Sequence, residues 1–346
     1  MTMTQTYFDS LSQASPDAQL QQLISGHWIA QAIAVAADLG IADLLADGPQ
    51  SSDELAQATD SHPGALYRLL RALAALGVFT EIEPKLFGLM PMAEALRADA
   101  PASLRNWAMH ACGDAQWRTW GQLGYSVRTG QPAFKEVHGM DNLQYRAQHP
   151  AAGAVSNAGM ASLATQVANA VVGAYDFSAV GTLVDVGGGQ GALLIAVLSA
   201  NSELRAVLFD LPRVVEGARE PLMAAGLFDR CQIVGGDMFD AVPAGGDAYM
   251  LSRVIHGWDD DRSVAILTNC RRVMQPHSKL LLVQEVIPPG DLYSYGKLSD
   301  LNMLVSPGGQ ERTETEYRAL LAAAGFTLAH VIPTRSRISL IEATPV

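Results

Sequence analysis

The sequence has few cysteines and no long apolar segment. Among its 346 residues only three are cysteines, and they lie far apart without C-x-x-C spacing: Cys112, Cys231 and Cys270. Neither a disulfide framework nor a cysteine-based zinc site is indicated. No uninterrupted apolar run reaches the ~18 residues of a membrane-spanning helix, and the polar N-terminus lacks the pattern of a signal peptide. We therefore expect a cytoplasmic protein that does not enter a membrane.

Positive charge is also scarce. The chain has 23 Lys and Arg against 35 Asp and Glu, a formal net charge of −12, and no cluster of basic residues. Because nucleic-acid surfaces neutralise phosphates with Lys and Arg, this balance argues against a nucleic-acid partner. Apolar residues, in contrast, make up 49% of the chain, which is typical of a globular protein. Small-molecule partners are the expectation.

The hydrophobic pattern divides the chain into two parts. From about residue 20 to 175 it is helical, with alanine-rich amphipathic stretches such as HWIAQAIAVAADLGIADLLA. From Gly181 on, short apolar strands alternate with helical segments, as in TLVDV, ALLIAVLSA, RAVLFD and KLLLVQEVI. This alternation predicts an α/β fold with a doubly wound, Rossmann-like parallel sheet. We place a helical domain at 1–100, a helical linker at 101–175 and the sheet domain at 176–346.

The segment SSDELAQATDSHPGALYRLLRALAALGVFTEIEPKLFGL has a winged-helix pattern. It predicts two short helices, a turn at residues 62–64 and a β-ribbon, with Ser52 capping the first helix. A winged helix can bind DNA through its second helix, but this one offers only Arg68 and Arg71 in an acidic protein. We favour a structural or dimer-forming module, and a ligand-responsive DNA-binding regulator is the alternative.

A glycine-rich loop follows the first strand of the sheet domain. LVDVGGGQGALL reads as a strand, a tight turn and a helix start, and Gly187 and Gly189 begin a G-x-G-x-x-G/A pattern. Asp210 ends the next strand about 20 residues later, as expected for a carboxylate that binds ribose hydroxyls. The motif alone does not separate NAD from S-adenosylmethionine, because both contain an adenosine.

Residues around the loop favour S-adenosylmethionine. Asp185, just before the glycines, puts an acceptor beside the site, which suits a ligand with an ammonium and a sulfonium better than a pyrophosphate. Asp237 and Met238, in VGGDMFD after the third strand, offer a carboxylate for the adenine amino group and a thioether to pack on the ring. An NAD oxidoreductase is the alternative.

With these residues in place, the chain resembles the S-adenosylmethionine-dependent O-methyltransferases of the caffeate and hydroxyindole type, including bacterial members that decorate natural products. The resemblance covers nearly the whole length and rests, in order, on ALYRLLRALAALGVF, VDVGGGQG, VLFDLP, GGDMFDAVP, SRVIHGWDD, LLLVQEVI and DLNMLVSPGGQERTETEYRALLAAAGF. It implies a methyltransferase sheet domain preceded by a winged-helix dimerisation domain. A homodimer is implied as well, with residues 101–175 contributing to the acceptor pocket.

The resemblance also implies individual roles. The implied cofactor-binding residues are Asp185, Gly187, Gly189, Asp210, Leu211, Asp237, Met238, Ser252 and Arg253. The implied catalytic residues are His256 as the base, with Glu285 and Glu311 as the acids that flank it. Met160, Asn302 and Met303 would face the acceptor. The family commonly has Asp after its histidine, where this chain has Gly257, so Glu285, Glu311 or another group would have to orient His256.

The residues around His256 allow two interpretations. In LSRVIHGWDDDRS it is either a general base or the last residue before a helix that Asp259–Asp261 cap and charge. For the three aspartates we favour the structural interpretation, and for His256 the catalytic one, because a carboxylate-oriented histidine can take the proton of an attacking hydroxyl. His110 and Trp107, in NWAMHACGDAQW, could line the acceptor pocket.

These observations predict a homodimeric enzyme that moves a methyl group from S-adenosylmethionine to a hydroxyl of an aromatic or polyketide-like small molecule. No metal is expected, since no metal ligands cluster in the sequence and a base is available. One alternative is a family member that binds the same cofactor but catalyses hydroxylation, decarboxylation or a pericyclic reaction. His256 counts against this alternative, whereas Gly257 leaves it open.

Overall fold

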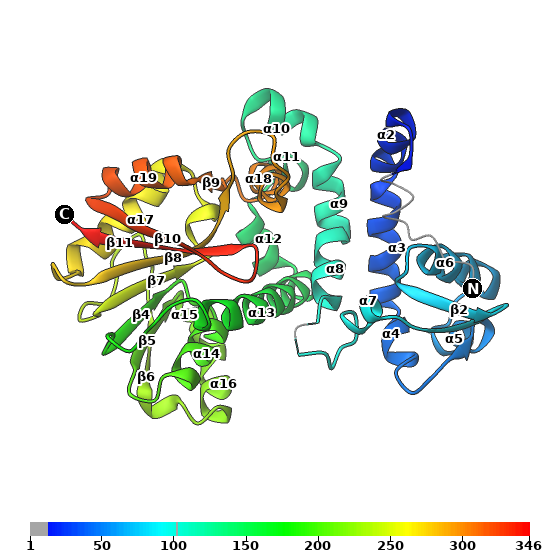
Figure 1. The fold of residues 1–346 in the computed structure, drawn as a ribbon, viewed down its shortest axis with the longest axis horizontal. Coiled ribbons are helices and arrows are strands. Elements are labelled where there is room, and N and C mark those ends of the chain that lie inside the picture. Colours follow the sequence, from blue (N-terminus) through cyan, green and yellow to red (C-terminus); the bar gives the residue numbers. More distant parts are fainter. Residues whose placement is uncertain (1–12, 102) are drawn as a thin grey trace. The chain divides into compact units, whose positions relative to one another are not determined.

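The computed structural model describes residues 13–101 and 103–346, which form two compact units (Figure 1). The N-terminal unit runs to Trp117 and includes Arg146–Leu163, and the sheet unit comprises Arg118–Tyr145 and Ala164–Val346. The first twelve residues of the domain expected at 1–100 lie outside the described chain. The division at residues 100 and 175 stays a prediction. No helix in the described chain is long and apolar enough to cross a membrane.

The N-terminal unit is helical with a small sheet of order β1-β3-β2. Its strands are β1 (Gln50–Ser51), β2 (Phe79–Glu83) and β3 (Leu86–Leu89). Its helices include α2 (Pro16–Ile24), α3 (Gly26–Asp38), α4 (Ile41–Leu44), α5 (Ser52–Ala58), α6 (Pro63–Ala75), α7 (Pro91–Glu94) and α8 (Arg105–Cys112). Three further helices have residues in both units: α9 (Asp114–Trp120), α12 (Asn142–Gln148) and α13 (Pro150–Val172).

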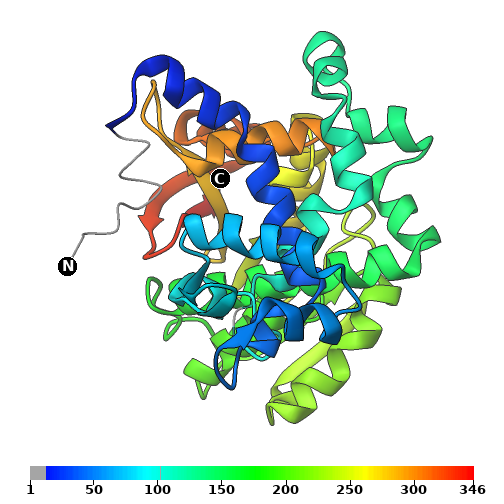
Figure 2. The same cartoon turned by 90° about the vertical axis from the view of Figure 1, so that its right-hand side faces the viewer.

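Local sequence explains the winged-helix part of this unit. Helix α5 is capped by Ser51, whose hydroxyl and backbone form a capping box with Glu54, so the predicted cap at Ser52 was wrong by one residue. Helix α6 starts at a proline and buries Leu66, Leu70 and Leu73, which share one helical face, in the core of the unit. Helices α3 and α6 are in contact (Figure 2). The two helices and the β-ribbon predicted from the sequence are present.

The sheet unit contains, within the described residues, a path of seven paired strands in the order β10-β11-β8-β7-β4-β5-β6, with β9 paired to β8. The strands are β4 (Thr182–Val186), β5 (Arg205–Asp210), β6 (Cys231–Gly235), β7 (Ala248–Ser252), β8 (Lys279–Ile287), β9 (Arg312–Thr313), β10 (Phe326–Pro333) and β11 (Ile338–Pro345). The strands from β6 to β8 run parallel, and β11 and β10 are antiparallel additions at one edge. The predicted doubly wound sheet is therefore confirmed.

Helices cover both faces of this sheet. The α-helices that lie wholly in the unit are α10 (Leu123–Thr129), α11 (Ala133–His138), α14 (Ala192–Ala200), α15 (Pro212–Val215), α16 (Arg219–Ala224), α17 (Asp260–Val273), α18 (Tyr295–Val305) and α19 (Glu314–Ala323). Short 3-10 turns are η1 (Glu216–Ala218), η2 (Phe228–Arg230) and η3 (Ile255–Gly257). Successive residues of β4 alternate between two cores: Leu183 packs with α14, and Val184 with α17 and α19.

The parallel strands bring the predicted site residues to one edge. Strand β4 ends at the glycine loop, β5 ends at Asp210, β7 ends at Ser252, and Glu285 lies near the end of β8. The carboxyl ends of neighbouring parallel strands lie together, and doubly wound folds bind their ligands there. The sheet thus collects residues that are up to about a hundred positions apart in the chain into one region.

Candidate active site

The glycine loop is shaped by backbone conformation and by close packing. Gly187 and Gly189 have φ angles of +73° and +62°, which residues with a side chain rarely adopt. A Cβ on Gly187 would lie 2.7 Å from Cγ2 of Val254, and one on Gly188 would lie 2.4 Å from Oδ2 of Asp185. The loop can therefore approach both the acid before it and the segment that leads to His256.

Asp210 closes the glycine loop against the end of β5. Its Oδ2 accepts a hydrogen bond from the backbone N–H of Gly189 at 2.9 Å, and its Oδ1 accepts one from the N–H of Leu211 at 2.7 Å. Burial nevertheless raises the pKa of Asp210 above its usual value. Because each carboxylate oxygen has a second lone pair, Asp210 keeps the capacity to accept bonds from two hydroxyls.

Asp185 is a buried acid without a protein partner for one oxygen. Its side chain is 1% exposed, and Oδ1 makes no hydrogen bond within the described residues. Burial, together with the nearby Asp210 charge, raises the pKa of Asp185 to about 7. A buried unpaired acceptor beside a glycine loop fits a cationic group such as the ammonium of S-adenosylmethionine.

The remaining predicted cofactor residues lie at the ends of β6 and β7. Asn269 of α17 donates to the carbonyls of Met238 and Phe239, both at 2.9 Å, and so fixes the loop that carries the exposed Asp237. Ser252 ends β7, and Arg253 follows with a φ of +55°. The N–H of Arg253 donates to the carbonyl of Val283 at 3.0 Å, which ties this strained residue to β8.

His256 forms a buried pair with Glu311. Nδ1 of His256 lies 2.8 Å from Oε1 of Glu311, and the two side chains are 10% and 1% exposed. Ser299 of α18 donates to the same Oε1 at 2.9 Å. Burial on its own would raise the pKa of Glu311, but the hydrogen bonds from His256 and Ser299 and nearby positive charge bring it below its usual value. A charged Glu311 favours the proton on Nδ1, which leaves the Nε2 lone pair of His256 as a proton acceptor.

Glu285, the other predicted acid, has a different partner. Its Oε1 lies 2.9 Å from Nε of Arg337, and burial raises the pKa of Glu285. The structure shows no hydrogen bond between Glu285 and His256, so of the two acids only Glu311 is hydrogen-bonded to the histidine. No side-chain atom fills the space beside Gly257, where a Cβ would meet nothing within 4 Å.

Arg312 was not predicted as a site residue, but it joins the His256 segment to the Glu311 segment. It is fully buried, and Nε and Nη2 donate to Oδ1 of Asp260 at 3.0 and 2.7 Å. Its guanidinium also donates to three backbone carbonyls, those of Trp258 and Gln310 at 3.1 Å and that of Ile255 at 3.4 Å. The ERTE sequence was part of the quoted motif, but no local pattern reveals these distant carbonyl partners.

The backbone of the two segments is also in direct contact. The N–H of Gln310 donates to the carbonyl of His256 at 2.8 Å. A Cβ on Gly309 would lie 2.0 Å from that carbonyl oxygen, so only glycine permits the approach. Asp259 caps α17 through the N–H of Arg262, as expected for the first of the three aspartates.

The predicted acceptor residues fall in both units. Asn302 and Met303 lie on α18 of the sheet unit, where the Asn302 amide oxygen accepts a hydrogen bond from Nε1 of Trp120 at 3.0 Å. Trp120 was not predicted. Trp107, His110 and Met160 belong to the N-terminal unit.

His110 is held in an uncharged state near neutral pH. The rings of Trp107 and His110 lie 5.8 Å apart, and burial, with a smaller contribution from the Arg146 charge, lowers the pKa of His110 to about 4. The acceptor roles of these residues stay predictions.

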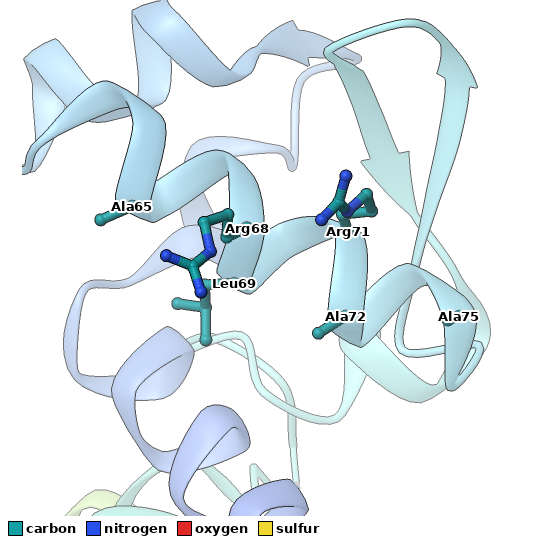
Figure 3. A pocket seen from close by; sticks show the side chains of 6 residues that line it. All are labelled: Ala65, Arg68, Leu69, Arg71, Ala72 and Ala75. Atoms are coloured by element: carbon teal, nitrogen blue, oxygen red, sulfur yellow. The ribbon is translucent and has the colours of Figure 1, made fainter.

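A hollow on the surface of α6 contains none of the predicted site residues. Figure 3 shows its lining, which comes from this one helix and consists of Ala65, Arg68, Leu69, Arg71, Ala72 and Ala75. Arg71 lies over the ring of Tyr67, with 5.5 Å between the guanidinium carbon and the ring centroid. The expectation of no nucleic-acid partner stays a prediction. Within the described chain, no three His, Cys, Asp or Glu residues are grouped as a metal site would require.

Comparison with known proteins identifies the class of this enzyme. Residues 120–327 match the model of the O-methyltransferase domain, and residues 21–99 match that of the O-methyltransferase dimerisation domain. The chain therefore belongs to the O-methyltransferase family, as the sequence motifs implied. It is an S-adenosylmethionine-dependent methyltransferase with a winged-helix dimerisation domain and a Rossmann-like catalytic domain.

Similar proteins act in natural-product pathways. The phenazine O-methyltransferase PhzM of Lysobacter antibioticus is 48% identical over 94% of this chain and 96% of its own. The structure of the mitomycin 7-O-methyltransferase MmcR matches with a TM-score of 0.89 at 38% identity, covering 97% of this chain and 100% of that one. The neocarzinostatin enzyme NcsB1, solved with S-adenosylmethionine and 2-hydroxy-5-methyl naphthoic acid, matches with a TM-score of 0.79 at 35% identity, covering 92% and 96%.

The Arg312→Met variant should lose stability. The substitution removes the guanidinium bonds to three backbone carbonyls and to Asp260, of which the carbonyls of Ile255 and Trp258 keep a weaker bond from Ser263. A buried group that loses a partner costs roughly 1–3 kcal/mol. We expect the free energy of unfolding to fall by about 3 kcal/mol in urea titration. Arg318→Met, which removes the exposed ion pair with Glu314, is the matched control and should change stability by less than about 1 kcal/mol. Equal losses of stability in Arg312→Met and Arg318→Met would contradict the role of Arg312 in joining the His256 and Glu311 segments.

Asp185→Asn should change how stability depends on pH. The pKa of Asp185 is about 7 in the folded protein against 3.8 in the reference state, so between these values the folded protein keeps a proton that the unfolded chain has lost. The free energy of unfolding therefore falls as pH rises through this window. Without cofactor, Asp185→Asn should melt at a higher temperature than wild type at pH 7.5, because its free energy of unfolding should be larger by roughly 4 kcal/mol, and the difference should nearly vanish at pH 4. A difference that does not depend on pH would refute the raised pKa.

Proposed function

We propose that this enzyme methylates a hydroxyl of an aromatic or polyketide-like small molecule and that His256 is the general base. The observation that carries the proposal is the buried pair of His256 and Glu311, which leaves Nε2 as a proton acceptor. The segment before this histidine packs on the glycine loop, since a Cβ on Gly187 would collide with Val254. The base and the expected cofactor site are therefore neighbours.

The residues around the glycine loop fit the parts of S-adenosylmethionine. Asp185 would pair with the ammonium, because its Oδ1 is buried and lacks a protein partner. Asp210 and Leu211 would hold the ribose and the adenine, and Asp237 and Met238 the adenine. Gly187 and Gly189 let the backbone approach the ligand, and Ser252 and Arg253 would complete the site at the end of β7.

For this reaction the protein has to position the acceptor hydroxyl and supply a base that takes its proton. When bound, S-adenosylmethionine supplies a methyl group on a positively charged sulfur that leaves as a neutral thioether. An acceptor hydroxyl held in line with this methyl group would take it from the sulfur, and the proton of that hydroxyl would go to Nε2 of His256. A phenol pKa of ~10 against ~6.5 for histidine makes prior deprotonation uphill by roughly 5 kcal/mol, so proton transfer accompanies attack. Glu311 stabilises the imidazolium that forms.

An aromatic acceptor is supported by the relatives, among them one named for phenazine and one solved with a naphthoic acid. Asn302 and Met303, which both lie on α18, would contact the acceptor. Met160, Trp107 and His110 would contact it as well. The alternative is a family member that catalyses hydroxylation, decarboxylation or a pericyclic reaction. It receives less support, because the His256–Glu311 pair is intact although Gly257 replaces the usual Asp. We still expect a cytoplasmic protein, because the three widely spaced cysteines suit a reducing compartment.

Methyl transfer and its base can be tested together. Wild type, incubated with methyl-deuterated S-adenosylmethionine, a phenol panel and a bacterial extract, should give products heavier by one labelled methyl in mass spectrometry. His256→Ala should lower this rate by roughly 10²- to 10⁴-fold, because the proton acceptor is lost. Cofactor affinity, measured by calorimetry, should not change.

Two carboxamide variants test which acid acts on His256. Glu311→Gln should slow transfer, because it removes the charge that holds the Nδ1 proton. Glu285→Gln is the matched control, since this acid is equally buried but pairs with Arg337. Equal losses in the two variants would argue against Glu311 as the orienting acid, and absence of labelled product with any acceptor would argue against methyl transfer.

We also propose that the chain is a homodimer joined through the N-terminal unit. The support is the dimerisation-domain match at residues 21–99 and a row of exposed apolar side chains on α2 and α3. These side chains, between 44% and 68% exposed, are Leu20, Leu23, Ile24, Trp28 and Val35. Monomers rarely leave such a patch in water.

Replacing Leu23 by Glu should weaken the dimer. A charge in an apolar interface loses its hydration without a partner, which costs several kcal/mol of association free energy. Light scattering after size exclusion should show a dimer for wild type and a concentration-dependent monomer for Leu23→Glu. Met223→Glu, on the exposed side of α16, introduces the same charge and should stay dimeric. A Leu23→Glu dimer as stable as wild type would place the interface elsewhere.

A further inference from the structure

Helix α18 connects the catalytic pair to a second polar side chain. Ser299 and Asn302 are three residues apart on this helix, so they lie on the same face. Ser299 donates to Oε1 of Glu311, which in turn binds His256. Asn302 therefore lies one helical turn, roughly 5 Å along the axis, from the contact that α18 makes with the catalytic pair.

Trp120 decides which way the Asn302 amide faces. Its Nε1 lies 3.0 Å from Oδ1 of Asn302. An indole N–H can only donate, so the oxygen of the amide must face Trp120 and the Nδ2 group must face away. Nδ2 makes no hydrogen bond within the described residues, and Asn302 is only partly buried. The amide thus offers a donor that the protein itself does not use.

We propose that Trp120 orients Asn302 so that Nδ2 binds a second, non-reacting oxygen of the acceptor. This inference rests on the proposed function, because it assumes that a hydroxyl is methylated beside His256. One helical turn exceeds the length of a hydrogen bond, so Nδ2 donates to an oxygen other than the one that loses its proton to His256.

The donor determines the kind of oxygen that can bind. Asp300 and Glu311 lie on or against the same part of α18, and the positive charges of Arg253 and Arg312 offset these two acids. The local charge therefore does not distinguish a carboxylate from a neutral carbonyl, and the Nδ2 group can donate to either. The acceptor class is a hydroxyarene with a carbonyl oxygen, of a ketone, quinone, ester or carboxylate, about one ring position removed from the reacting hydroxyl. Trp120 acts as a positioning residue, since it reaches the acceptor only through Asn302.

A matched pair of acceptors tests the proposal. 7-Hydroxy-1-tetralone and 5,6,7,8-tetrahydro-2-naphthol share one skeleton and the position of the hydroxyl, and only the first has a carbonyl. We would measure kcat and KM for both, and their dissociation constants by calorimetry with S-adenosylhomocysteine present. Wild type should prefer the ketone. In Trp120→Phe, which keeps an aromatic ring but loses the N–H, this preference should fall about five- to tenfold, through KM and the dissociation constant.

Two further variants separate positioning from packing. Trp120→His keeps a ring N–H and should retain part of the preference, whereas Trp117→Phe, an exposed tryptophan of the N-terminal unit, should not change it. Equal losses for both acceptors in Trp120→Phe would show a merely structural role. No preference for the ketone in wild type would likewise overturn the proposal. If both acceptors bind but neither is methylated, methyl transfer fails, and the ratio of dissociation constants still decides the role of Trp120.

Discussion

The hydrogen bond from the backbone N–H of Gln310 to the carbonyl of His256 is the contact on which the geometry of the His256–Glu311 pair depends. It joins the segment after β7 to the segment before β9, and Glu311 follows Gln310 directly. Gly309 makes the approach possible, because any side chain there would overlap the His256 carbonyl. Arg312 then closes the same junction with its guanidinium. The distance between Nδ1 and Oε1 is thus set by backbone contacts rather than by two flexible side chains.

At the edge of the sheet where the cofactor is expected, one buried acid lowers the stability of the protein. Asp185 is desolvated, lies near Asp210 and has an oxygen without a protein partner, so the free protein is destabilised when this group is charged. A cation that pairs with it recovers the lost interaction, and binding then favours the folded state. The positive φ of Arg253 is a second local cost at the same edge. Residues that would be poor choices for stability are therefore concentrated where a ligand is expected.

The sequence predicted the elements and the edge of the site, but not the contacts within it. Strand ends can be read from hydrophobic runs, and parallel order follows from their alternation with helices, so Asp185 and Asp210 could be placed together in advance. Glu285 and Glu311 could not be distinguished, because both lie at the same edge and the choice depends on Arg337 and Ser299. Trp120 was missed for the same reason. Its partner is 182 residues away, and no periodicity reports such a pairing.

Gly257 bears on the choice between methyl transfer and other chemistry. In the family pattern the carboxylate after the histidine is close to the base, and its loss would be serious if nothing else fixed the imidazole. Here Glu311 binds Nδ1 and is itself held by Ser299 and by its own N–H, which donates to Asp300. The orientation of His256 is therefore determined without a side chain at position 257, where a Cβ would meet nothing within 4 Å. The lack of a carboxylate at position 257 therefore does not remove the group that holds the imidazole, and the proposed proton transfer to His256 does not require one there.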